Sequence, residues 1–88
     1  MTSNLFKRAA AENLHREIST SNMMADRAYE AENEREYGGD MFRYWVQRKY
    51  MFMDFAIKTF DFAVPEELSS PDQARFVLEL LELQFKGE

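Results

Sequence analysis

The chain contains no cysteine and only one histidine, His15, among its 88 residues. The absence of cysteine excludes disulfide bonds, thiolate zinc sites and cysteine nucleophiles. A single histidine cannot supply the several imidazole ligands that a histidine-based metal centre requires within one chain. We therefore expect neither a metal nor a cofactor.

Glycine and proline are also scarce, with 3 and 2 residues, whereas hydrophobic residues make up 45% of the chain and aromatic residues 15%. This balance favours packed regular structure over loops. The length suffices for one small domain and leaves no room for separate catalytic and cofactor domains. The sequence predicts a single helical domain over residues 1–88.

Long apolar runs are missing as well. No apolar stretch is long enough to span a bilayer, and the first residues do not contain the apolar core of a secretory signal. These absences, together with the lack of cysteine, predict a cytoplasmic protein without membrane contact.

Three segments carry helical patterns, at about residues 3–37, 41–62 and 71–85. In the first segment an apolar stripe repeats every fourth residue, which is a helical period. Polar residues 19–22 interrupt it, since short polar side chains compete for backbone hydrogen bonds. Two interpretations stay open, a kinked long helix and two separate helices, and the kinked helix is preferred. The residues of the stripe are Phe6, Ala10, Leu14 and Ile18.

The segments are separated by clear helix ends. Gly38 suits the left-handed residue that closes a helix, and Asp40 suits the N-cap of the next one. So short a connection predicts an antiparallel hairpin of the first two helices. Pro65 is expected to end the second helix, and Ser70 to cap the third. The predicted fold is all-α: a helical hairpin plus a C-terminal helix.

The second helix is apolar around most of its circumference. At about 100° per residue, its polar side chains gather in one narrow sector. Such a helix is normally buried, which predicts that it forms the central element. The apolar surfaces of the second and third helices exceed what the first can cover, so we expect a homo-oligomer. The polar sector comprises Arg43, Gln47, Asp54, Lys58 and Asp61.

The sequence predicts no enzyme. Gly38-Gly39 lacks the lysine and hydroxyl residue of a phosphate-binding loop. His15 is expected on a solvated helix surface, and acidic pairs such as Glu30 and Glu34 look like a solvated face because no Glu-x-x-His motif accompanies them.

Arg48 and Lys49 are the sharpest candidate site residues, because both lie outside the polar sector of the second helix. Each must extend its charge to solvent, pair with an acid, or face an interface. Of these alternatives, contact with a partner is preferred. The neighbouring candidates for partner binding are Arg43, Tyr44, Trp45 and Tyr50. For the three aromatic residues burial in the core is the preferred interpretation, and contact with a protein or with nucleic-acid bases is the alternative.

The formal net charge is −5, yet residues 41–60 carry four basic side chains against one acidic side chain. The main hypothesis is a non-enzymatic interaction module, an adaptor, inhibitor or small subunit that occupies a protein surface. Chains of this length are common among accessory proteins, including phage and plasmid products. The alternatives are nucleic-acid binding through the basic aromatic segment 43–58, which the net charge disfavours, and acidic mimicry of nucleic acid.

Overall fold

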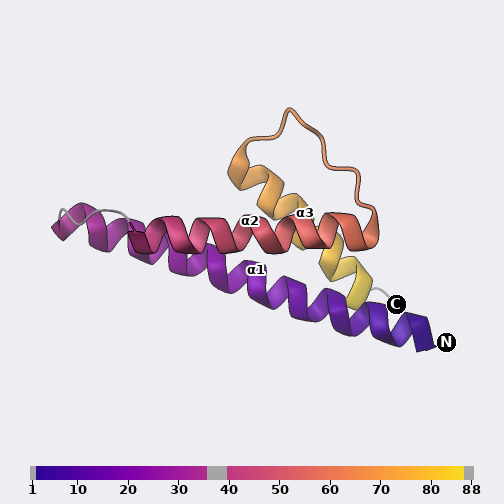
Figure 1. Ribbon diagram of the computed structural model, residues 1–88. Helices are drawn as coiled ribbons and strands as arrows, with labels where there is room; N and C mark the ends of the chain where they lie inside the picture. The colour runs from indigo at the N-terminus through magenta and orange to yellow at the C-terminus, as the bar shows by residue number, and fades with distance from the viewer. Residues whose placement is uncertain (1, 36–39, 87–88) are drawn as a thin grey trace.

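Three α-helices form the computed structural model, which describes residues 2–35 and 40–86 (Figure 1). Helix α1 covers Thr2–Arg35, α2 covers Asp40–Phe60 and α3 covers Ser70–Lys86. No strand occurs in these ranges, and the helices pack as a compact bundle. The all-α prediction is therefore confirmed.

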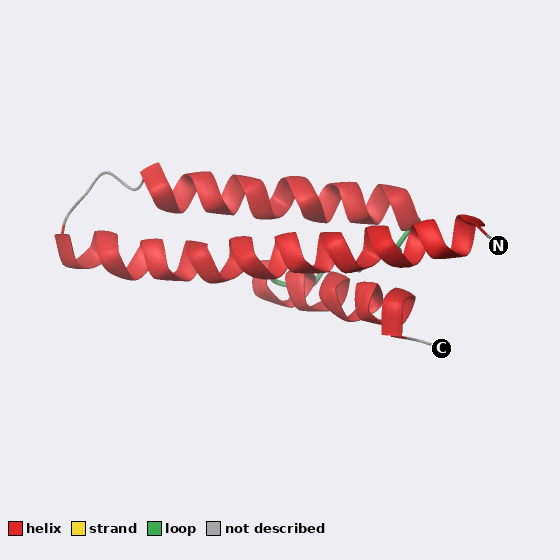
Figure 2. Ribbon diagram, turned by 90° about the horizontal axis from the view of Figure 1, so that it is seen from below, coloured by secondary structure: helices red, strands yellow, loops and turns green. Residues whose placement is uncertain are grey.

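The central element of the bundle is α1, not α2 as the sequence suggested. Helix α1 lies between the other two and packs against both, whereas α2 and α3 make few contacts with each other (Figure 2). The bundle measures 51 × 27 × 18 Å. Because α2 packs mainly on α1 and little on α3, it is not surrounded by other helices.

Helix α1 is continuous through the polar run 19–22, so the alternative of two separate helices is wrong. Its buried side chains alternate at spacings of three and four residues, which is the seam by which one helix packs on another. The predicted stripe was partly misplaced, because Phe6 is largely exposed and Ala10 is half-buried. The buried side chains are Ala11, Leu14, Ile18, Ser21 and Ala25.

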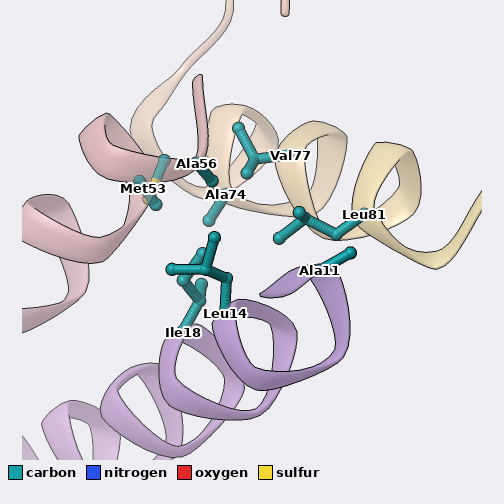
Figure 3. Close-up of a cluster of buried hydrophobic side chains, with 8 residues drawn as sticks. All are labelled: Ala11, Leu14, Ile18, Met53, Ala56, Ala74, Val77 and Leu81. Carbon is teal, nitrogen blue, oxygen red and sulfur yellow. The ribbon is translucent and has the colours of Figure 1, made fainter. Parts of the chain in front are cut away.

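The hydrophobic core lies where α1 meets the other two helices (Figure 3). Small residues on all three helices let the backbones approach closely, while the larger side chains fill the space between them. Half-buried aromatic side chains such as Phe52 and Phe60 cover its edges. The core residues are Ala11, Leu14, Ile18, Met53, Ala56, Ala74, Val77 and Leu81.

Helix α2 ends at Phe60, before the predicted boundary, and Pro65 is not what stops it. Asp61 adopts the left-handed conformation, with φ of 57°. The backbone N–H of Phe62 then donates to the carbonyl oxygen of Ile57 at 3.1 Å, which is the Schellman arrangement. The rings of Phe60 and Phe62 stack at 5.5 Å over this turn.

Helix α3 is capped one residue earlier than the sequence predicted. The Oγ of Ser69, rather than that of Ser70, accepts the backbone N–H of Asp72 at 3.4 Å. The side-chain amide of Gln73 donates to the carbonyl oxygen of Leu68 at 3.0 Å, which fixes the entry of the chain into the helix.

Two further expectations concern the bundle as a whole. The Gly38-Gly39 turn lies outside the described residues, so the hairpin stays a prediction. None of the helices in residues 2–35 and 40–86 combines the length and hydrophobicity needed to cross a bilayer.

Candidate functional site

A line of large apolar side chains is exposed on the outer side of α2. We call it the α2 ridge: Met41, Tyr44, Met51 and Phe55, with exposed fractions of 56%, 50%, 55% and 62%. Steps of three or four residues keep side chains on one face of a helix. Position 48 completes this series, so Arg48 lies in the middle of the ridge.

Arg48 is half-buried and contacts α1. Its Nη2 lies 3.4 Å from Oε1 of Glu17, with side chains 35% and 41% exposed. Its guanidinium also lies 5.1 Å from the centre of the Phe52 ring. The charge within the ridge is thus paired with an acid of the same chain while remaining partly accessible.

Lys49 points the other way, into the bundle. It is only 9% exposed, and its Nζ donates to Oδ1 of Asn22 at 3.3 Å. The ammonium also lies 5.0 Å from the centre of the Tyr50 ring. Among the described residues no carboxylate lies within ion-pair distance of it. The cation is therefore held by an amide and an aromatic ring.

The remaining predicted site residues divide between different faces of α2. Tyr44 belongs to the ridge and meets the half-buried Trp45 edge to face at 5.0 Å. Arg43 and Tyr50 are exposed and, being seven residues apart, share a second face. The structure brings Tyr44, Trp45 and Arg48 to one side, and Lys49 lies on another.

A groove of about 560 Å³ lies among the three helices on the Lys49 side. Its polar walls carry both signs of charge: Lys49 from α2, Asp26 from α1 and Arg75 from α3. Arg75 is itself 3.7 Å from Asp72. In the described ranges no group of three potential metal ligands is found.

His15 is not the solvated residue that the sequence predicted. It is half-buried, its Nε2 lies 3.0 Å from Oε2 of Glu82, and its ring meets Phe85 edge on at 5.3 Å. No serine or threonine hydroxyl in the described part of the chain is hydrogen-bonded to it. His15 therefore joins α1 to α3 and lacks the contact that would activate a nucleophile.

The basic residues of segment 43–58 do not form one patch. Arg48 is paired with Glu17, Lys49 is buried, and Lys58 pairs with Asp54 at 3.0 Å. A phosphate backbone is bound by cations that line up along one surface. The geometry of α2 spreads these cations over several faces instead.

Comparison with known proteins gives no relative on which to base a function. No protein-family model, no curated protein and no solved structure matches the chain. A function is therefore inferred from the α2 ridge and its surroundings.

Proposed function

We propose that the protein is a non-enzymatic protein-interaction module, an adaptor, inhibitor or small subunit that occupies a partner's surface with the α2 ridge. The observation that carries this proposal is the ridge itself. Four large apolar side chains, each half or more exposed, stand in line on one helix. Scattered apolar side chains on a surface are ordinary, whereas contiguous ones mark interaction sites.

The residue types of the ridge favour a protein partner over a nucleic acid. Aromatic residues and methionine are enriched in the buried centres of protein interfaces. Nucleic-acid binding ranks below, because the net charge is −5 and three of the four cations of α2, Arg48, Lys49 and Lys58, are paired or buried. A nucleic-acid complex would weaken steeply with salt, whereas contact through an apolar ridge would change little.

The antiparallel hairpin belongs to the same proposal, because it sets which side of α2 faces outward. Two contacts between α1 and α2 support it. Tyr29, late in α1, meets Phe42, early in α2, at 5.4 Å. Glu17, in the first half of α1, pairs with Arg48 further along α2. The later residue of α1 therefore contacts the earlier residue of α2, and the earlier residue of α1 contacts the later one, as is expected for antiparallel helices.

The proposal is tested by affinity capture from the native host with three forms of the protein. These are the wild type, Met51→Asp in the ridge, and Met23→Asp as a matched control. Met23 is an exposed methionine of α1 outside the ridge, so both variants change charge and hydrophobicity equally. Captured proteins are identified by mass spectrometry and then measured as purified pairs.

We expect Met51→Asp to weaken a genuine partner by about 100-fold, since it places a carboxylate in an apolar contact, and Met23→Asp to leave binding unchanged. Partners that bind both variants as tightly as the wild type would contradict a role for the ridge.

A further inference from the structure

We infer that the α2 ridge pairs with the α2 ridge of a second copy of this chain, in antiparallel orientation and centred at the level of residue 49. The inference rests on the proposed function, because it names the partner of the same surface. Two independent properties of α2 support it: the spacing of its exposed apolar side chains and the order of its exposed charges.

The apolar spacing suits helix-to-helix packing. Positions 41, 44, 48, 51 and 55 alternate steps of three and four residues, which is the seam that two helices share in a coiled coil. With the pair centred at the level of residue 49, Tyr44 of one copy comes within one residue, about 1.5 Å along the axis, of the level of Phe55 of the other. Both aromatic side chains, half or more exposed in the single chain, are then covered.

The charges along one flank of the ridge are self-complementary. At about 100° per residue, Asp40, Arg43, Asp54 and Lys58 fall within one sector of roughly 60°, and all four are exposed. Antiparallel pairing about residue 49 places Asp40 level with Lys58 of the second copy, and Arg43 within one residue of the level of Asp54. Each pair occurs twice because of the twofold symmetry.

The order of the charges also favours the antiparallel orientation over the parallel one. In a parallel twofold pair, the charged flank of one copy lies beside the opposite flank of the other, which carries Trp45 and Phe52 and no exposed charge. The four charges then gain no partner across the interface. The sequence of signs, acid then base before the centre and acid then base after it, forms ion pairs only in the antiparallel orientation, and such complementarity sets orientation more than it sets affinity.

Arg48 stands near the twofold axis, where two copies of one cation would repel each other. Each guanidinium is already 3.4 Å from Glu17 of its own chain, and that carboxylate is 41% exposed. Two such pairs side by side make an alternating arrangement of charges. A single polar residue within an apolar seam fixes the register of the helices at some cost in affinity, and Arg48 has this position here.

The first test is the mass in solution, measured by light scattering coupled to size-exclusion chromatography and by sedimentation equilibrium. We expect twice the chain mass of 10.5 kDa for the wild type. Met51→Asp should weaken self-association by about 100-fold, and Met23→Asp should leave it unchanged. A wild-type monomer at micromolar concentration, or a dimer indifferent to Met51→Asp, would overturn the inference.

The second test addresses the charges. Asp54→Arg and Arg43→Asp should each weaken the dimer by about 10-fold, because each places two like-charged pairs across the interface. The double variant should restore the wild-type affinity. Asp54→Arg also creates a like charge within its own helix, four residues from Lys58. Glu79→Arg on α3 is the matched control, because it creates the same kind of contact, four residues from Arg75. Failure of the double variant to recover would refute the proposed register.

The third test determines the orientation of the two helices by disulfide cross-linking. Because the chain contains no cysteine, the introduced residue is the only thiol in each variant. Tyr44→Cys and Phe55→Cys are oxidised separately and as a mixture. The antiparallel pair predicts a disulfide between the two different variants and none within either. A disulfide between two Tyr44→Cys chains would show parallel pairing and overturn the inference.

Failure of this inference can be distinguished from failure of the proposed function. A monomeric wild type that still loses a captured protein on Met51→Asp refutes self-pairing and leaves the interaction role intact. A dimer that follows all three tests, but whose captured partners ignore the ridge variants, supports self-pairing and removes the ridge from contact with other proteins.

Discussion

Substitution of Lys49 tests whether a buried cation stabilises this fold or weakens it. The ammonium is 9% exposed and has the amide oxygen of Asn22 as its hydrogen-bond acceptor at 3.3 Å. Removing an ammonium from water costs several kcal/mol, and a hydrogen bond that involves a charged group returns about 1.5–3 kcal/mol. We therefore expect Lys49→Met, which keeps the apolar stem, to raise the free energy of unfolding by about 1 kcal/mol.

Two companion variants separate charge from packing. Lys49→Ala also removes three methylene groups worth about 0.8 kcal/mol each, so it should be less stable than Lys49→Met by about 2 kcal/mol. Arg48→Met removes a pair whose side chains are 35% and 41% exposed. Partly exposed pairs contribute less than about 1 kcal/mol, so this variant should change stability little.

Urea unfolding followed by circular dichroism, with Trp45 fluorescence as a second probe, measures all three effects. The Met51→Asp background keeps association from contributing to stability. A gain of 1 kcal/mol corresponds to a rise in melting temperature of about 4–8 °C for a domain of this size. A loss of more than about 1 kcal/mol in Lys49→Met would refute the reasoning, because the ammonium would then be net stabilising.

Three further predictions concern single groups in the described helices and their ends. Ser21 is fully buried and its hydroxyl has no hydrogen-bond partner in the described part of the chain, so Ser21→Ala should stabilise by about 1–2 kcal/mol in thermal melts; an equal gain from Ser19→Ala, half-buried in the same helix, would show that helix propensity alone is responsible. Asp61→Gly should raise the urea midpoint by an amount equivalent to about 0.5–1 kcal/mol, because glycine adopts the observed φ of 57° without steric cost; a lower midpoint would contradict this. Ser69→Ala should lower stability by about 1 kcal/mol through loss of the cap, with Ser70→Ala neutral in the same assay; the reverse order would identify Ser70 as the cap.

The positions of the three helices could be predicted from the sequence because they depend on local patterns. The helix ends were less accurate where the local signal was ambiguous. Ser69 and Ser70 are both good caps, and only the backbone path decides that Ser69 accepts the N–H of Asp72. Asp61 ends α2 in a left-handed conformation that is usually adopted by glycine, and no local sequence pattern predicts a helix end at this residue.

Helix geometry predicted where the candidate site residues lie around α2, but not which side chains of the other helices they contact. The angle around α2 sufficed to place Arg48 and Lys49 outside the polar sector. Their opposite surroundings depend on Glu17 and Asn22, which lie 31 and 27 residues away. The contact of His15 with a carboxylate 67 residues away was missed for the same reason. Contacts between residues so far apart depend on how the helices pack against each other, and the pattern of a single sequence does not determine that packing.

The α2 ridge is a consequence of which helix lies at the centre. From the sequence, the most apolar helix was expected there, because burial stabilises large apolar side chains. The central position goes instead to α1, whose buried seam includes Ala11 and Ala25 and lets two neighbours approach closely on adjacent sides. A helix that is contacted on two sides needs small residues, whereas one that is contacted on one side keeps its remaining large residues exposed. The surplus of apolar surface predicted for the chain is therefore concentrated on the outer side of α2, where Phe55 is 62% exposed, and a second helix with the same surface is the simplest complement to it.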